Sequence, residues 1–289
     1  MDKQVKQLFK RGSRTYFISS LFFPKAIYEQ VSTLYAFVRK ADNFVDAVPQ
    51  DVEGFRNFRI AYQKAWQGIP SGDVVIDGFV VLARTKNFQP AWIEAFLDAM
   101  AADITTKTYE TLADVEAYMY GSAEVVGLMM ARILDLPAAS YAYAQRLGKA
   151  MQYINFIRDV AEDLSLGRTY LPQAELRACG LESLAAQHVL QHPVQFRAFM
   201  HMQIGRYQAW QVESQRGFAY IPRQLCIPIK TAADMYGWTA RCIAAKPLQI
   251  FRRKIKPSVL RVLGTGLLNM LRRDRGYGEV RLINAGAFF

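Results

Sequence analysis

The chain has 289 residues, a hydrophobic content of 52% and a formal net charge of +11. This length is compatible with one large helical domain, so we predict a single domain over residues 1–289. The sequence has no run of about 20 apolar residues to span a membrane, and the polar residues 1–6 lack the apolar core of a signal peptide. Three scattered cysteines favour reduced thiols, so we predict a cytoplasmic protein.

The first element whose side chains suit a binding or catalytic site is a predicted helix near residues 31–46. Its apolar part, Val31 to Val38, leads into Arg39, and Asp42 and Asp46 follow four residues apart. On a helix this spacing puts both carboxylates on one face. An acidic pair alone is most often a solvated helix face. A second acidic segment in a matching apolar setting makes a shared cation site the better interpretation.

Between the two acidic segments the apolar spacing is mostly helical, as in the stripe of Trp92, Phe96 and Met100. Strand-like alternation is scarce, and its best examples are residues 74–82 and 220–229. We find no repeat and no linker that would divide the chain into domains. The predicted fold class is therefore all-α, with long helices around a central apolar cavity whose mouth carries the acids.

The second acidic segment covers residues 155–163. Asp159, Glu162 and Asp163 fall at i, i+3 and i+4, and an apolar stretch at 150–154 leads into them. Like charges on one helix face repel each other, and the repulsion grows where water is scarce. This arrangement predicts a bound cation. Oxygen ligands favour Mg²⁺, which binds through a few carboxylates and the phosphates of its substrate.

Arginines accompany both acidic segments: Arg39 lies beside the first, and Arg158 and Arg168 lie beside the second. A diphosphate needs such neighbours, because its oxygens must be held and its leaving charge neutralised. The residues alone therefore predict a magnesium-assisted diphosphate site. Arg39 and Arg158 can also serve as ion-pair partners of the acids, and the two roles are compatible.

The last element is a basic amphipathic segment, residues 246–275. It carries nine Lys and Arg residues against one acid, Asp274, with apolar residues between them. A solvated helix face is the usual meaning of such a segment. The second interpretation is peripheral contact with the inner face of an anionic membrane, at about 1 kcal/mol per basic residue. No nucleic-acid motif accompanies the charge, so we expect no nucleic-acid partner.

The sequence resembles the squalene/phytoene synthase family, the head-to-head prenyl-diphosphate synthases, over about residues 10–257. Four family segments carry the resemblance: an N-terminal diphosphate-contacting segment, a first aspartate-rich motif, a tyrosine segment and a second aspartate-rich motif. The chain departs from the family at Asn43, where a second acid is usual, and at Glu124, where a small or uncharged residue is usual. The four matching segments are Gly12–Tyr16, Arg39-x-x-Asp42-x-x-x-Asp46, Tyr118–Gly127 and Asn155–Pro172, which contains Asp159-x-x-Glu162-Asp163.

The resemblance implies an isoprenoid-synthase-like helical bundle with magnesium as the cofactor. It also implies a catalytic role for Tyr118, near the reacting carbons, and for Arg39 and Arg158. The implied metal ligands are Asp42, Asp46, Asn155, Asp159 and Asp163. The implied diphosphate contacts are Gly12, Ser13, Arg14, Thr15, Tyr35, Arg39, Gln152, Arg158, Arg168 and Tyr236.

The implied reaction is a head-to-head condensation of two prenyl diphosphates through a cyclopropylcarbinyl diphosphate. We expect the phytoene type, which joins two C20 geranylgeranyl diphosphates. The alternative joins two C15 farnesyl diphosphates to squalene or dehydrosqualene, and only squalene would require NADPH. Two other hypotheses are a non-catalytic, membrane-associated assembly protein of the same fold and a class I terpene cyclase or head-to-tail elongating enzyme. The retained acids argue against the former, and the Tyr118 segment argues against the latter.

Overall fold

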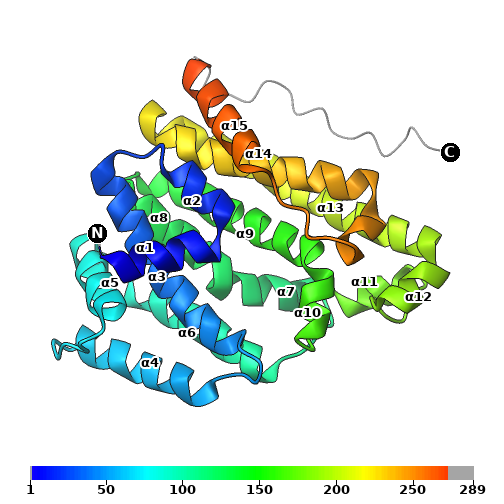
Figure 1. Ribbon diagram of the computed structural model, residues 1–289, viewed down its shortest axis with the longest axis horizontal. Coiled ribbons are helices and arrows are strands. Elements are labelled where there is room, and N and C mark those ends of the chain that lie inside the picture. Colours follow the sequence, from blue (N-terminus) through cyan, green and yellow to red (C-terminus); the bar gives the residue numbers. More distant parts are fainter. Residues whose placement is uncertain (1, 273–289) are drawn as a thin grey trace.

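The computed structural model describes residues 2–272, and helices form nearly all of it (Figure 1). No strand occurs in this part of the chain, where one isolated bridge joins Thr108 to Thr169. The prediction of an all-α fold is confirmed. In chain order the α-helices are α1 (Lys3–Gly12), α2 (Arg14–Ser20), α3 (Lys25–Val45), α4 (Val52–Trp66), α5 (Val74–Thr85), α6 (Pro90–Thr105), α7 (Leu112–Met119), α8 (Val125–Ile133), α9 (Tyr141–Arg158), α10 (Val160–Ser165), α11 (Gln173–Ala178), α12 (Ala186–Gln191), α13 (Pro193–Gln215), α14 (Arg223–Ala245) and α15 (Val259–Leu271).

The two segments with strand-like alternation are helical, so that interpretation of them is wrong. Residues 74–82 lie in α5, where the side chain of Asp73 accepts hydrogen bonds from the first N–H groups and caps the helix. The second segment contributes the first turns of α14, with Pro228 inside the helix. The buried residues of α5 recur at helical spacing on one broad face, and the burial of that face outweighs the β preference of its valines.

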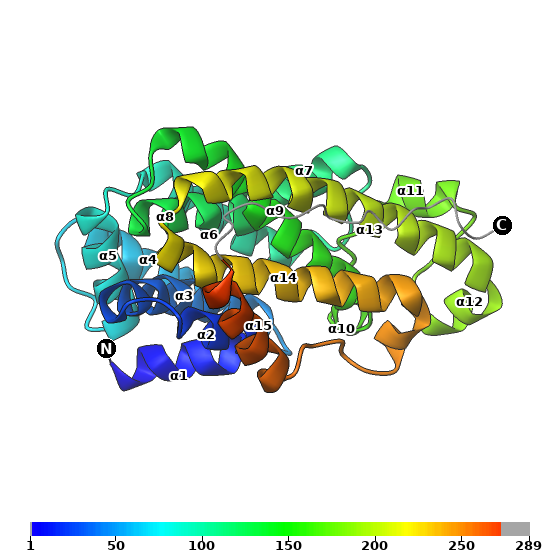
Figure 2. The ribbon, with the colours of Figure 1, turned by 90° about the horizontal axis from the view of Figure 1, so that it is seen from above.

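Helix α9 packs against α8, α13, α14 and η1, a π-helical turn at Tyr120–Glu124. Helix α3 packs against α1, α4, α5 and α6. Figure 2 shows these groups from above, with α13 and α14 as long neighbouring rods. One hydrophobic cluster joins the helices and includes residues from Val5 to Ile255. This shared core supports our proposal that residues 1–289 form a single domain.

Helix α3 divides its surface between core and cavity. Its apolar side buries Leu34, Phe37 and Ala41, at most 2% exposed, and the ring of Phe37 stacks on Phe79 of α5 at 3.7 Å between centroids. The spacing of these residues is that of one helix face. The polar side chains in the second half of α3, after Phe37, lie on the face of the helix that does not pack into this core.

The second acidic segment does not lie in one continuous helix. Helix α9 ends at Arg158, and Asp159 breaks it with φ −99° and ψ 13° before α10 begins. The N–H of Asp163 still donates to the carbonyl of Asp159 at 2.9 Å. The helical spacing is therefore kept across the break, so the side chains of Asp159 and Asp163 still lie on the same side of the chain.

Helix α15 lies across α14 and α2 at the surface of the bundle (Figure 1). Ser258 caps its N-terminus by accepting a hydrogen bond from the N–H of Arg261. None of the helices within residues 2–272 combines the length and the apolar character that a membrane span requires. Residues 273–275 of the predicted basic segment lie outside the described residues.

Candidate active site

A central cavity of about 630 Å³ opens between α2, α3, α9, α10 and α14. Its deeper part is lined by apolar side chains from α6, α8 and α9, and its mouth is lined by charged side chains. All the site residues predicted from the sequence border this one cavity. They are Gly12, Ser13, Arg14, Thr15, Tyr35, Arg39, Asp42, Asp46, Tyr118, Gln152, Asn155, Arg158, Asp159, Asp163, Arg168 and Tyr236.

One wall of the mouth is the acidic end of α3. Arg39 forms an ion pair with Asp42, and its Nη1 lies 3.9 Å from Asp46 Oδ2. Arg168, which is 3% exposed, donates from Nη1 to Asp46 Oδ1 at 3.0 Å. Burial, followed by the charge of Asp46, raises the pKa of Asp42 to about 7. The two carboxylates are therefore crowded, although two arginines lie beside them.

The opposite wall comes from the junction of α9 and α10. Arg158 Nε donates to Asp159 Oδ1 at 2.8 Å, and Lys254 Nζ lies 3.2 Å from the same oxygen. Burial alone would raise the pKa of Asp159, but the hydrogen bonds and charge of Arg158, together with Lys254, hold it below its usual value. Burial and the charges of Asp159 and Glu162 raise the pKa of Asp163 to about 8. Asp159 therefore has two cationic partners, whereas Asp163 forms no ion pair within residues 2–272.

The donor set at the mouth fits a hard divalent cation. Its atoms are carboxylate and amide oxygens, which Mg²⁺ prefers. Asn155 Oδ1 is buried and has no hydrogen-bond partner among the residues that the structure describes, whereas buried oxygens normally accept a hydrogen bond. Within residues 2–272 no three His, Cys, Asp or Glu side chains gather closely enough to hold an ion. Cationic side chains engage several of the carboxylates, so a bound metal would have to displace Arg39, Arg158 or Lys254 from them.

Behind the mouth, a buried carboxylate organises two tyrosines. Asp103, near the end of α6, is 2% exposed and accepts hydrogen bonds from Tyr118 Oη at 2.8 Å and Tyr170 Oη at 2.7 Å. Arg168 Nη1 also donates to Tyr170 Oη at 3.2 Å. All four side chains border the cavity. The sequence interpretation missed Asp103, whose one signal is an acid within an apolar helix.

Tyr118 is held as a neutral hydrogen-bond donor. Burial, followed by the charge of Asp103, keeps the pKa of Tyr118 well above its usual value. Burial also raises the pKa of Asp103, and the hydrogen bonds from Tyr170 and Tyr118 oppose part of that rise. The hydroxyl of Tyr118 therefore points to Asp103, which fixes where its ring can lie.

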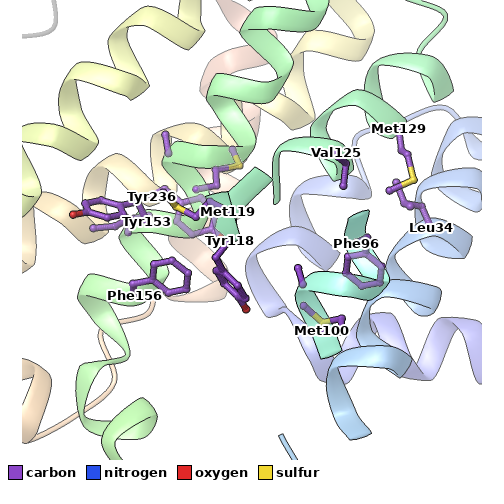
Figure 3. Packing of buried hydrophobic residues seen from close by; sticks show 14 of the residues in the cluster. Leu34, Phe96, Met100, Tyr118, Met119, Val125, Met129, Tyr153, Phe156 and Tyr236 are labelled. Carbon is purple, nitrogen blue, oxygen red and sulfur yellow. The ribbon is translucent and has the colours of Figure 1, made fainter. Parts of the chain in front are cut away.

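Aromatic rings form the cavity wall around this carboxylate. Phe156 stacks on Tyr170 at 4.4 Å between ring centroids, and Tyr118 lies 6.1 Å from Phe156. Figure 3 shows Tyr118 and Phe156 as neighbours, with Phe96 and Met100 of α6 on the other side of the view. Ring faces attract cations by about 0.5–2 kcal/mol each. The wall is therefore suited to a positively charged, apolar guest.

The tyrosine segment includes a π-helical turn between α7 and α8. Such turns are rare and occur frequently at functional sites. Gly121 permits this turn to approach α6, because a Cβ at that position would lie 2.3 Å from the carbonyl oxygen of Ala95. Glu124, the departure noted in the sequence, forms a largely buried ion pair with Lys149 of α9 at 2.9 Å. Its charge therefore has a partner outside the cavity.

Two lysines of the C-terminal basic segment reach the mouth. Lys254 and Lys256 follow η4 (Pro247–Phe251) and border the cavity. Lys254 also forms an ion pair with Glu162, and burial and the charge of Lys254 lower the pKa of Lys256. The sequence interpretation placed both lysines on a basic surface, because nothing in their spacing shows that the chain folds back over α10.

Comparisons with known proteins point to one family. A family model described as squalene/phytoene synthase matches residues 9–261. The 15-cis-phytoene synthase of Synechococcus elongatus is 26% identical, and the alignment covers 93% of this chain and 92% of that protein. The 15-cis-phytoene synthase of Synechocystis sp. is 27% identical, with 86% and 78% covered.

Solved structures of related enzymes have the same fold. A dehydrosqualene synthase in complex with a ligand superimposes with a TM-score of 0.81 at 24% identity, over 92% of this chain and 94% of that one. A squalene synthase from Alicyclobacillus acidocaldarius gives a TM-score of 0.74 at 22% identity, over 84% and 92% of the two chains.

Proposed function

Since the chain belongs to the squalene/phytoene synthase family, we propose that its central cavity condenses two prenyl diphosphates head to head, as a prenyltransferase of the phytoene type. The observation that carries the proposal is the pairing of a charged mouth with an apolar, aromatic interior in one cavity. A prenyl diphosphate has this polarity, with an anionic head and a hydrocarbon tail. Head-to-head condensation also needs a carbocation to survive away from water, which the interior provides.

The mouth would hold the diphosphates. Asp42, Asp46, Asn155, Asp159 and Asp163 are the residues that would bind magnesium, whose charge would stabilise the departing diphosphate. The remaining oxygens would be held by the guanidinium groups and by polar residues of the N-terminal segment and α14. These contacts are Gly12, Ser13, Arg14, Thr15, Tyr35, Arg39, Gln152, Arg158, Arg168 and Tyr236.

The interior would guide the two carbon–carbon steps. Loss of the first diphosphate leaves an allylic cation, and the double bond of the second chain attacks it to give a new cation. Transfer of one proton to a base such as the released diphosphate closes the ring of the cyclopropylcarbinyl diphosphate. That intermediate loses its diphosphate in the same cavity, and the rearranged cation loses a second proton to give phytoene. Tyr118, Phe156 and Tyr170 present aromatic rings to the rearranging cation, and the buried charge of Asp103 lies behind two of them. We assign Asp103 the role of positioning Tyr118 and Tyr170.

The phytoene product is favoured by the relatives, two of which are named 15-cis-phytoene synthase and align over most of this chain. The test is to incubate the purified protein and Mg²⁺ with geranylgeranyl or farnesyl diphosphate, with and without NADPH, and to identify the hydrocarbon. We expect phytoene from the C20 substrate without a reductant. A squalene product that requires NADPH would replace the phytoene assignment, and no hydrocarbon from either substrate would contradict the proposed reaction.

The two lysines at the mouth should contribute to substrate binding. We expect Lys254→Gln/Lys256→Gln to raise KM for the prenyl diphosphate about tenfold, because the two partly solvated lysines together should contribute about 1.4 kcal/mol, less than the roughly 1.5–3 kcal/mol of a single buried charge-assisted contact. Steady-state kinetics at saturating Mg²⁺ would measure it, with Arg252→Gln/Arg253→Gln as the control that removes equal charge from exposed neighbours. An unchanged KM would place both lysines outside the substrate site.

We also propose peripheral contact between α15 and the cytoplasmic face of an anionic membrane. Leu260 and Leu271 are 81% and 78% exposed, and Leu267 is 57% exposed, so α15 presents an apolar face to solvent. Exposed Arg252 and Arg253 precede this helix. An exposed apolar helix face with basic neighbours is typical of proteins that bind membrane surfaces.

This contact should depend on salt. We expect partitioning onto anionic vesicles to fall at least tenfold when salt is raised from about 0.05 to 0.5 M, because the Debye length shrinks below the distance between the charges and the surface. Vesicle co-sedimentation would measure it. Equal partitioning onto neutral and anionic vesicles would remove the electrostatic part of the proposal.

A further inference from the structure

A second cavity, which we call the rear hollow, lies between α13, α14 and α15 and has a volume of about 320 Å³. It borders a different face of α14 from the central cavity: Ala232 and Tyr236 line the central cavity, whereas Ala233, Gly237 and Arg241 line the rear hollow. In Figure 2 α14 lies between α13 and α15, and it packs against both of them. A single helix therefore separates the two cavities, and no residue assigned to prenyl transfer borders the second.

The rear hollow contains buried polar groups without partners. Gln211 is 6% exposed, and neither its Oε1 nor its Nε2 forms a hydrogen bond with any residue from 2 to 272. Tyr207 is 1% exposed, and its hydroxyl also has no hydrogen-bond partner in the described part of the chain. Both side chains border the hollow. Because buried amides and hydroxyls are nearly always hydrogen-bonded, these groups indicate a polar guest in the hollow.

Two arginines add positive charge at the same place. Arg241 folds back along α14, so that its Nη1 lies 3.5 Å from the position that a Cβ on Gly237 would take. The guanidinium carbon of Arg261 lies 4.9 Å from the ring centroid of the neighbouring Trp238. Within residues 2–272 neither arginine forms an ion pair with a carboxylate. The guest favoured by this rim is therefore an anion.

The acid that borders the rear hollow does not reverse this conclusion. Asp234 lies 3.2 Å from Lys230 Nζ and accepts a hydrogen bond from Asn269 Nδ2 at 2.9 Å. Its charge is therefore balanced within the bundle. The exposed Arg272 also borders the hollow and adds to its positive charge.

The rear hollow adjoins the exposed apolar face of α15. Arg261, Thr265 and Leu268 border the hollow, at the spacing of one helix face. At about 100° per residue, the exposed Leu260, Leu267 and Leu271 fall on the adjacent face. Leu268 belongs to both, because it borders the hollow and is 55% exposed. An anion site and an apolar surface thus share one edge.

We propose that the rear hollow binds the phosphate group of an anionic phospholipid. The guanidinium groups of Arg241 and Arg261 and the Nε2 of Gln211 donate to phosphate oxygens, while the acyl chains lie along the leucines of α15. A soluble phosphate monoester offers the same head group without the chains. The proposal extends the membrane contact described above, but it does not depend on the prenyl-transfer chemistry.

The test compares variants of the full chain on vesicles of phosphatidylcholine with and without phosphatidylglycerol. Arg241→Gln/Arg261→Gln should weaken partitioning onto the anionic vesicles about tenfold or more. The matched control, Arg56→Gln/Arg197→Gln, removes equal charge from exposed positions on α4 and α13 and should weaken it less than about twofold. Equal losses in the two variants would overturn the proposal, because only overall charge would then matter.

A third variant distinguishes binding by the polar groups inside the rear hollow from the effect of its positive charge. Gln211→Met keeps the net charge and removes the unpaired amide, so it should keep or raise the melting temperature of the free protein and still weaken anionic-vesicle binding. Binding equal to that of the unmodified protein would contradict a role for the hollow.

The soluble arm uses glycerol 3-phosphate, measured by calorimetry. Suppose that glycerol 3-phosphate binds the unmodified protein but not Arg241→Gln/Arg261→Gln, while both proteins bind vesicles equally. The ligand of the rear hollow is then a soluble phosphate monoester and not a phospholipid, which overturns the proposal. Hydrocarbon formation by Arg241→Gln/Arg261→Gln in detergent should match that of the unmodified protein. This readout keeps a failure of the rear hollow distinct from a failure of the proposed reaction.

Discussion

Asp159→Asn should lower magnesium-dependent hydrocarbon formation about 10³-fold or more. Asp159 is the acid at which Arg158 and Lys254 meet, and as a proposed metal ligand it joins the magnesium to the arginines of the mouth. Removing one preorganised electrostatic group at a developing charge typically costs about 10²- to 10³-fold in kcat, and loss of a metal ligand should cost at least as much. Product formation and Mg²⁺-dependent thermal stabilisation by a prenyl diphosphate analogue would both be measured.

The control for Asp159 is Asp135→Asn, because the carboxylate of Asp135 is 76% exposed and pairs with Lys86 at the surface. It should leave product formation unchanged, since exposed ion pairs contribute little. If Asp159→Asn keeps both product formation and the magnesium-dependent stabilisation, the acids of the mouth do not bind metal.

Asp103→Asn should lower kcat about 10²-fold while leaving KM nearly unchanged. The amide keeps the size of the side chain but removes the charge that accepts hydrogen bonds from Tyr118 and Tyr170. Hydrogen bonds to a charged acceptor are worth about 1.5–3 kcal/mol, and their loss would free both rings in the cavity wall. Because neither ring holds diphosphate, the effect should appear in the chemical steps rather than in binding.

Helix α6 offers a matched control for this second variant. Asp98 lies on the same helix, is 66% exposed and pairs with Arg59 at 2.8 Å, so Asp98→Asn should preserve kcat. Thermal unfolding of both variants would separate a positioning role from loss of the fold. A folded Asp103→Asn protein with unaltered kcat would exclude the positioning role.

The two acidic motifs could be predicted from the sequence because their chemistry is local. Asp42 with Asp46, and Asp159 with Asp163, each lie within about one helical turn, so spacing alone puts each pair on one side. Their apolar neighbours also indicated burial. The structure adds what spacing cannot show, namely that Arg168 joins the two motifs by donating to Asp46 at 3.0 Å.

Asp103, Lys254 and Lys256 could not be predicted in the same way. Asp103 meets Tyr170 from 67 positions away, and Lys254 meets Glu162 across 92 positions. Such contacts depend on how helices pack, and no local pattern records them. The strand interpretation of residues 74–82 was wrong for a different reason, since the helix there buries one broad apolar face and this burial outweighs the β preference of its valines.

We propose that opposed acids on α3 and on the α9–α10 junction hold divalent metal for a departing diphosphate. Diffraction from crystals grown with Mn²⁺ and a non-cleavable prenyl thiodiphosphate would locate the metal by its anomalous signal. We expect metal between the carboxylates of Asp42 and Asp46 and those of Asp159 and Asp163, with Arg39 and Arg158 turned to the phosphates. Metal bound elsewhere, or a diphosphate held while these acids keep their present ion pairs, would contradict the account.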